Sequence, residues 1–199
     1  MKPTRRQEIL DAAKALFNKR GFNGVSTRDI AGALGISKGN LTYYFKKKED
    51  ILEAILLEKP EPVPPKPPEN LLELDAFFGQ MQNLVQENSY YFWHHTQLAQ
   101  LSPAIQERQE GVYQRNVNTL TVALKTLADN GLIRKEEHSG QYARLVDALL
   151  MTAIYWIPFC EVSRREPADP KRGMQRQEWS LLLPLLTDKG KNIVLEQIL

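Results

Sequence analysis

The chain has 199 residues, of which 42% are hydrophobic and 25% are charged. These are ordinary values for a folded globular protein, so they exclude a largely disordered, low-complexity or collagen-like chain. Cys160 is the only cysteine, which excludes an intramolecular disulfide scaffold and is typical of a reducing compartment. The most apolar stretch, residues 148–159, is shorter than the roughly 20 residues that cross a bilayer. No secretory signal is visible, so we expect a cytoplasmic protein without a membrane span.

The formal net charge of +2 hides an uneven distribution of charge along the chain. Residues 1–48 contain eleven Lys and Arg residues and three acidic residues, a charge of +8, which leaves −6 for residues 49–199. A basic segment ahead of an acidic one suggests that the basic segment binds a polyanion. Lysines scattered over a solvated surface are the alternative, and charge alone does not decide between the two.

Four helices are predicted in the N-terminal part of the chain from the spacing of apolar side chains. The first covers residues 5–20 and ends before Gly21. The second covers residues 27–34 and follows a Ser-x-x-Asp pattern that is typical of a helix start. The third covers residues 37–45, and the fourth covers residues 49–59.

A proline-rich segment follows the fourth predicted helix. Residues 60–68 contain six of the twelve prolines, and no helix persists through such a run. We expect a semi-rigid connector in the polyproline II conformation, with a site for a proline-binding partner as the alternative. The predicted domains are therefore a small one in residues 1–48, a connecting helix and linker in residues 49–68, and a larger one in residues 69–199.

Every segment beyond this linker is also predicted to be helical. The expected helices cover residues 71–101, 104–129, 139–165 and 174–199. Pro158 is expected to kink the third of them, and the last is expected to be interrupted near Pro184 and Gly190. No segment has the alternating pattern of a β-strand, so the predicted fold class is all-α.

The second and third predicted helices have the spacing of a helix-turn-helix, joined by a short turn at Gly35. Ala31 is small enough to let the two helices cross closely. The outward residues of the third helix contain no carboxylate and offer hydrogen-bonding groups: Lys38, Gly39, Asn40, Thr42, Tyr43 and Tyr44. Such a surface can lie in a major groove and read bases. An ordinary helical hairpin with a glycine turn is the alternative.

A longer set of residues strongly resembles the tetracycline-repressor (TetR/AcrR) family. The matching positions lie within residues 5–57 and are Arg5-Arg6, Ile9-Leu10, Ala12-Ala13, Leu16-Phe17, Gly21-Phe22, Ser26 to Ala31, Gly35 to Phe45 and Lys48 to Leu52. The resemblance implies a homodimeric bacterial transcription regulator, usually a repressor. It also implies an N-terminal helix-turn-helix domain that binds a palindromic operator, and a larger helical domain that dimerises and often binds a small effector.

The resemblance also assigns roles to residues of the small domain. Thr27 and Lys48 match phosphate contacts, Tyr43 and Tyr44 match an aromatic pair that commonly touches the DNA backbone, and the start of the third helix matches positions that reach bases or phosphates. By its chemistry Asn40 is the best direct reader, because Asn can pair bidentately with adenine. The predicted DNA-binding residues are Thr27, Arg28, Ser37, Lys38, Gly39, Asn40, Thr42, Tyr43, Tyr44 and Lys48. Asn40 and Thr42 replace the more usual Thr and Tyr of the family.

An aromatic cluster at residues 90–93 is the most suggestive feature of the larger predicted domain. Neighbouring residues on a helix point in different directions, so these side chains cannot all face one cavity, and ordinary core packing is one interpretation. A mostly apolar pocket between helices is the other. The candidate ligand-binding residues are Phe78, Met81, Trp93, Gln97, Tyr113, Asn116, Tyr155 and Phe159.

The sequence offers no convincing set of catalytic or metal-ligating residues. His94 and His95 are adjacent and diverge by about 100° on a helix, whereas helical metal ligands prefer an i, i+4 spacing. Neither a Ser-His-Asp set nor a phosphate-binding glycine loop appears. Cys160 lies in an apolar segment and is expected to be a core residue. We therefore expect no cofactor, no metal ion and no enzymatic activity.

Two apolar segments near the C-terminus predict a dimer. Residues 142–163 are too apolar to face water on all sides, and residues 176–199 carry many leucines. Two helices from each chain could form a four-helix interface, with burial inside one protomer as the alternative. The candidate dimerisation residues are Leu149, Ala153, Trp156, Trp179, Leu182 and Leu186.

Together these patterns predict a dimeric DNA-binding repressor that a small-molecule effector releases from a palindromic operator. Its expected partners are double-stranded DNA, a second copy of the chain and an unidentified effector. Its expected location is the bacterial cytoplasm, at the nucleoid when DNA is bound. A DNA-bound adaptor whose larger domain binds a protein is the first alternative, and an enzyme built on helices is the second.

Overall fold

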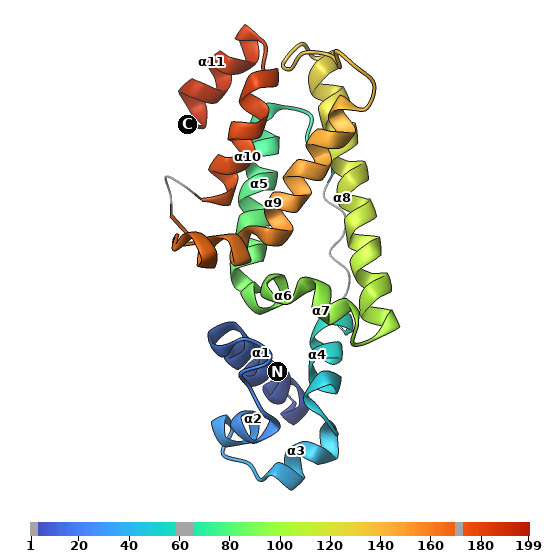
Figure 1. Cartoon of the computed structure of the whole chain (residues 1–199), viewed down its shortest axis with the longest axis vertical. Coiled ribbons are helices and arrows are strands. Elements are labelled where there is room, and N and C mark those ends of the chain that lie inside the picture. Colours follow the sequence, from blue (N-terminus) through green and yellow to red (C-terminus); the bar gives the residue numbers. More distant parts are fainter. Residues whose placement is uncertain (1–3, 59–65, 170–172) are drawn as a thin grey trace. The chain divides into compact units, whose positions relative to one another are not determined.

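A computed structural model describes residues 4–58, 66–169 and 173–199 of the chain. Within these residues it contains eleven α-helices, one 3-10 helix and no β-strand, which confirms the predicted all-α class (Figure 1). The helices are α1 (Arg5–Arg20), α2 (Thr27–Ala33), α3 (Lys38–Tyr44), α4 (Lys48–Leu57), α5 (Leu71–Glu87), α6 (Ser89–Trp93), α7 (His95–Ala99), α8 (Pro103–Asp129), α9 (Gln141–Ser163), α10 (Met174–Leu182), η1 (Leu183–Leu185) and α11 (Asp188–Gln197). Most of the predicted proline connector lies outside the described residues.

The helices form two compact units. The first comprises the described part of residues 1–61 together with residues 88–110, and the second comprises the described part of residues 62–87 together with residues 111–199. The first unit therefore includes α6, α7 and the start of α8 in addition to the four N-terminal helices. The functional boundaries at residues 48 and 68 remain a prediction.

The first unit is organised around α1, which contacts α2, α4 and α6. Its buried face carries Ile9, Ala13 and Phe17, at the spacing that places them on one side of a helix. They pack in one apolar cluster with Ile30 of α2 and Leu41 of α3. The underside of the helix-turn-helix thus rests on α1, which leaves the opposite side of α3 exposed.

The predicted helix over residues 71–101 is wrong, because the structure divides it into α5, α6 and α7. The side-chain oxygen of Asn18 on α1 accepts hydrogen bonds from the Tyr90 N–H, at 3.3 Å, and from the Ser89 hydroxyl, at 3.2 Å. The Tyr90 ring is buried with its centroid 5.8 Å from that of Phe17. Packing against α1 therefore replaces the continuous helix that the local sequence favours.

The second unit has its core between α5, α9 and α10, which contact one another. Residues of α8 and α11 complete its buried cluster. The members of the whole cluster are Leu71, Leu74, Phe77, Phe78, Leu120, Leu124, Leu127, Ala128, Leu132, Ile133, Tyr142, Val146, Leu149, Leu150, Trp179, Leu182, Leu186 and Val194. The Phe78 and Trp179 rings lie edge to face, with centroids 5.7 Å apart. Such aromatic pairs add to the stabilisation that burial alone provides.

Gly190 does not interrupt the last helix, contrary to the prediction, whereas η1 does separate α10 from α11 around Pro184. Gly190 lies in the first turn of α11, where a Cβ atom would be 2.1 Å from the carbonyl oxygen of Leu132. The absent side chain thus allows α11 to begin against the loop that follows α8. The Thr187 N–H donates to the same carbonyl at 3.1 Å.

The six candidate dimerisation residues are at most 4% exposed, so they belong to the core of one protomer. Their burial agrees with the alternative of packing inside one protomer. A dimer interface would then be formed by other, exposed side chains. By length and composition α9 is the one described helix that could cross a membrane. It runs through Pro158 without ending and contributes eight buried residues to the fold. These contacts with α5 and α10 are those of a core helix.

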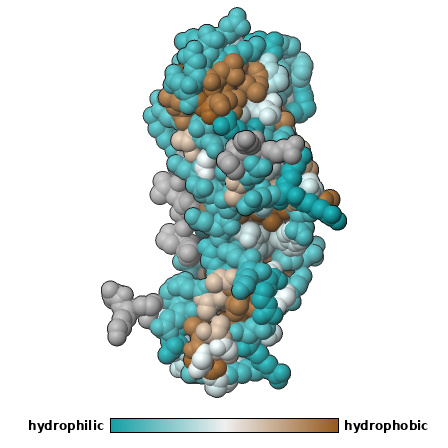
Figure 2. All heavy atoms as spheres, turned by 90° about the vertical axis from the view of Figure 1, so that its left-hand side faces the viewer, coloured by the Kyte–Doolittle hydropathy of each residue, from teal (hydrophilic) through white to brown (hydrophobic). Residues whose placement is uncertain are grey.

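The surface of the second unit also carries apolar side chains. Figure 2 shows a largely hydrophilic face on which hydrophobic atoms gather at the upper end, at the level of α11. Leu195 of α11 and Leu199 have exposed side chains. Exposed apolar residues of this kind are common on the surfaces of folded proteins.

Candidate nucleic-acid interface

The start of α2 is fixed by a capping box. The Ser26 side chain accepts a hydrogen bond from the Asp29 N–H at 3.2 Å, and Asp29 accepts one from the Ser26 N–H at 2.8 Å. Arg20 of α1 forms an ion pair with Asp29 at 3.0 Å. These bonds to Ser26 and Arg20 hold the pKa of the Asp29 carboxyl well below its usual range, so the carboxylate is ionised and compensated.

The turn between α2 and α3 depends on Gly35. Its φ is +64°, a left-handed conformation that glycine adopts without strain. The Ile36 N–H then bonds back to the Ala31 carbonyl at 3.0 Å, and the Gly35 N–H bonds to the Gly32 carbonyl at 3.1 Å. The turn at Gly35 is therefore sharp enough to bring α3 across α2.

The outer face of α3 carries polar groups and aromatic hydroxyls. Asn40 and Thr42 are exposed, and Tyr43 has 84% of its surface exposed. Tyr44 is more enclosed, and its ring meets that of Tyr43 edge to face at 5.2 Å. The Thr42 hydroxyl donates to the Lys38 carbonyl at 2.8 Å. The hydroxyl thus has a partner on its own helix, whereas the amide of Asn40 is presented to solvent.

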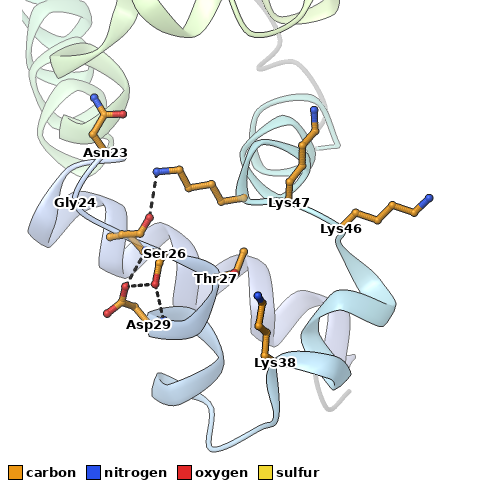
Figure 3. Close-up of a pocket in the computed structure, with 10 residues that line it drawn as sticks. Asn23, Gly24, Ser26, Thr27, Asp29, Lys38, Lys46 and Lys47 are labelled. Atoms are coloured by element: carbon orange, nitrogen blue, oxygen red, sulfur yellow. Dashed lines mark hydrogen bonds between the residues drawn. The ribbon is translucent and has the colours of Figure 1, made fainter.

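A depression of about 510 Å³ lies beside this face (Figure 3). It is lined by the α1–α2 loop, the start of α2 and the basic residues around α3: Asn23, Gly24, Val25, Ser26, Thr27, Asp29, Lys38, Lys46, Lys47 and Lys48. We call it the basic depression. In Figure 3 the Lys38 side chain points upward beside Thr27, and Lys46 points away from the helices. Asp29 is its one acid, so the lining carries a net positive charge that suits phosphate.

Lys48 differs from the other lysines in this lining. Its ammonium group donates to the Phe22 carbonyl at 2.9 Å and to the Val25 carbonyl at 3.1 Å, and it lies 4.3 Å from the centroid of the Phe22 ring. Lys46 and Lys47 are exposed, whereas Lys48 is partly buried.

The ten predicted DNA-binding residues lie on α2, on α3 and its N-cap, and at the start of α4. The sequence-based set omitted Asn23, Lys46 and Lys47, which also line the basic depression. The three consecutive lysines were the available signal for two of them. The position of Asn23 in this lining depends on the folded loop between α1 and α2, so the sequence contained no signal for it. The roles of these residues toward DNA remain predictions.

The eight candidate ligand-binding residues have different environments. Phe78 is a core residue, and Met81 packs against the same core. Tyr113, Tyr155 and Phe159 are exposed on α8 and α9, and the Tyr113 hydroxyl donates to Asp147 at 3.2 Å. The remaining members are Trp93 and Gln97, exposed in the first unit, and Asn116, half-buried on α8. An effector site remains a prediction.

Within the described residues no group of three His, Cys, Asp or Glu side chains is placed to hold a metal ion. His94 has its Nδ1 3.1 Å from the side-chain oxygen of Gln97, and burial lowers the pKa of the neighbouring His95. Cys160 is buried, and its burial raises the pKa of the thiol. A raised pKa favours the unreactive thiol over the thiolate.

Two family models match the sequence. One is described as "Bacterial regulatory proteins, tetR family" and matches residues 9–55, and the other is described as "Bacterial transcriptional repressor" and matches residues 61–194. Neither description names an enzyme.

Curated relatives match the N-terminal part of the chain. Over 55 residues the chain is 46% identical to the transcriptional repressor KstR2 of Rhodococcus jostii. The aligned segment covers 28% of this chain and 27% of the relative. Over 58 residues it is 36% identical to the probable transcriptional regulator YttP of Bacillus subtilis, covering 29% and 28% of the two chains. The matched segment thus spans about a quarter of the length of these relatives.

Solved structures match nearly the whole chain. A TetR-family transcriptional regulator from Marinobacter aquaeolei has a TM-score of 0.79 and 22% identity, covering 97% of this chain and 96% of that one. The ketosteroid transcriptional regulator KstR2 of Mycobacterium tuberculosis has a TM-score of 0.62 and 18% identity, covering 94% and 98%. At these identities the likeness concerns the fold.

Proposed function

Because the chain belongs to the TetR family of bacterial regulatory proteins, we propose that it is a sequence-specific DNA-binding repressor that a small molecule releases from its operator. The observation that carries the proposal is the exposed, carboxylate-free face of α3 beside the basic depression. Base readout requires hydrogen-bonding groups on an element that fits the major groove, and phosphate binding requires positive charge beside it.

In this proposal α3 enters the major groove. Lys38, Lys46 and Lys47 contact phosphates at the edge of the groove, and these contacts fix the position of the helix without reading sequence. Asn40 then reads a base edge, with adenine as the preferred partner. The hydroxyl of the exposed Tyr43, near the end of α3, contacts the DNA backbone in this proposal.

We further propose that two copies pair through the exposed face of α9. Met151, Tyr155, Phe159 and Val162 recur at helical spacing on this face and are between 46% and 87% exposed. Pairing would remove this apolar surface from water and would relate the two α3 helices by a two-fold axis. The operator would then be an inverted repeat, with half-sites one DNA turn apart or a multiple of it.

The effector is proposed to bind the second unit and to favour a form of the dimer that does not fit the operator. Support comes from the family and from one structural neighbour, SmeT, solved as a complex with triclosan, with a TM-score of 0.55 and 18% identity. A protein partner bound by the second unit is the competing proposal. Loss of operator binding on adding a small molecule favours the effector, and capture of a protein without any ligand response favours the adaptor.

Selection of bound duplexes from random DNA tests the proposed function. Enrichment of an inverted repeat is expected, because two identical heads read two identical half-sites. The spacing of the repeat reports the distance between the two α3 helices. Absence of any enriched sequence would contradict sequence-specific binding, and an enriched single half-site would contradict the dimer. The proposed location, the cytoplasm with the nucleoid as the bound state, follows from the same partner.

A further inference from the structure

We propose that Lys48 assists DNA binding as a positioning residue, which holds the loop between α1 and α2 and does not itself contact a phosphate. The inference rests on the proposed DNA binding and deepens it. It separates Lys48 from Lys46 and Lys47, although the three are consecutive in the sequence and line the same basic depression.

The ammonium of Lys48 is already engaged within the protein. It donates to the carbonyls of Phe22 and Val25 at 2.9 and 3.1 Å, and it lies over the Phe22 ring. An ammonium has three N–H donors, so two of them are directed into the loop. Charge-assisted hydrogen bonds of this kind are stronger than neutral ones, and they oppose movement of Lys48 toward a phosphate.

The carbonyls that Lys48 holds belong to a tightly built loop. The Val25 N–H bonds back to the Phe22 carbonyl at 3.4 Å, and both side chains are buried. A Cβ atom at Gly24 would lie 2.4 Å from the Arg20 carbonyl oxygen, so the chain passes close to the end of α1. Lys48, the first residue of α4, therefore joins this loop to the segment that follows α3.

The carbonyls that Lys48 holds lie in the loop directly before the capped start of α2. The Val25 carbonyl is part of the peptide group that leads to Ser26, whose side chain caps α2. Thr27, the first residue of α2, lines the basic depression together with Lys46. When the ammonium is removed, the loop loses two hydrogen bonds, and the separation between Thr27 and the lysines of the α3–α4 segment is no longer fixed from this side.

The two roles predict different dependences on salt. A lysine that contacts a phosphate releases a counterion on binding, so its loss reduces the slope of log K against log salt by about one. A lysine that positions a loop weakens binding at every salt concentration without changing that slope. We expect Lys48→Met to weaken duplex binding about tenfold with an unchanged slope.

Lys47→Met is the matched control, because Lys47 is the adjacent lysine and is exposed. We expect it to lower the slope by about one and to leave the melting temperature unchanged. All binding is measured well below the lower melting temperature of the variants, so that both are folded. A slope that falls by one in Lys48→Met, with an unchanged melting temperature, would overturn the proposal.

Hydrogen exchange in the free proteins supplies a test that does not need DNA. Amides from Val25 to Ile30 should exchange faster in Lys48→Met than in wild type, and they should be unchanged in Lys47→Met. Unchanged exchange in Lys48→Met would contradict the positioning role. A wild-type chain that binds no duplex would instead contradict the proposed function, while the exchange comparison would still test the contact of Lys48 with the loop.

Discussion

Charged side chains of the first unit serve two purposes. Arg6 of α1 forms an ion pair with Glu58 beyond α4, and its guanidinium lies 4.9 Å from the centroid of the Phe45 ring. Lys48 likewise holds a loop, whereas Lys46 and Lys47 are directed to solvent. The basic character of residues 1–48 is therefore divided between cations that hold helices together and cations available to a polyanion.

Asn40→Ala should relax the base preference at one position of each half-site. Its amide is the best-suited reader on α3, and loss of a bidentate contact with adenine removes about 1–3 kcal/mol of discrimination. The selection from random duplexes, repeated with the variant, measures the change. An unchanged preference at every position would reject Asn40 as a reader of bases, and Lys46→Met serves as the control that weakens binding without changing the preference.

Glu178 carries a pH dependence that is unrelated to DNA. Its side chain is 2% exposed in α10, and its Oε2 has no hydrogen-bond partner among the described residues. The nearby donors of Gln175 and Trp179 bond to Asp75 on α5. Burial raises the pKa of the Glu178 carboxyl well above its ordinary value of 4.5, so the folded chain favours the neutral acid.

The neutral Glu178 contributes its full stability below the ordinary pKa, which the carboxyl has in the unfolded chain. This stability should be lost as the pH rises from that value to the raised pKa of the folded chain. The free energy of unfolding of the wild type should then fall by up to about 1.4 kcal/mol per pH unit in that interval. Glu178→Gln should remove this slope, and Glu161→Gln, at an exposed position of α9, should retain it. Equal slopes in wild type and Glu178→Gln would exclude Glu178 as the cause.

At the scale of helices, the sequence predicted the helix ends that are set by interactions between residues close together in the chain. The bounds of α1 and the start of α2 follow from apolar spacing and from the caps at Thr4 and Ser26. The break at Asn88 precedes Ser89 and Tyr90, which contact Asn18 and Phe17, about 70 residues away in the sequence. No local pattern contains that information, so the prediction of one long helix failed there.

Gly190→Ala should destabilise the second unit. The added Cβ would lie 2.1 Å from the Leu132 carbonyl, so α11 or the loop after α8 must move. We expect a loss of about 1–3 kcal/mol in the free energy of unfolding. Gly32→Ala in α2 is the control, because its Cβ meets nothing within 4 Å and should stabilise the helix by roughly 0.5–1 kcal/mol. Urea unfolding measures both, and equal effects would contradict the close approach at Gly190.

Tyr155→Glu should convert a dimer into a monomer. The substitution places a charge in the centre of the exposed apolar face of α9, where pairing would have to desolvate it. Light scattering at micromolar concentration should give twice the 22.8 kDa chain mass for wild type and the chain mass for the variant. Leu195→Glu, at the exposed face of α11, should remain dimeric. A monomeric wild type would remove the proposed interface.

At the scale of the whole molecule, the sequence predicted the helix-turn-helix of the first unit better than the effector and dimer residues, most of which lie in the second unit. The small unit is specified by caps, a glycine turn and a carboxylate-free face, all of which can be read within 50 residues. The effector and dimer residues depend on which helix faces another, and apolar spacing does not indicate this. Phe78 and Tyr155 both fit an apolar face, yet one is core and the other is exposed.

Binding of DNA by the first unit can be measured with the purified chain and a labelled duplex of mixed sequence, by fluorescence anisotropy as salt is raised from low ionic strength. The exposed lysines of the basic depression should give measurable binding that weakens steeply and linearly in log salt. Failure to bind any duplex at low ionic strength would contradict the assignment of this surface to DNA.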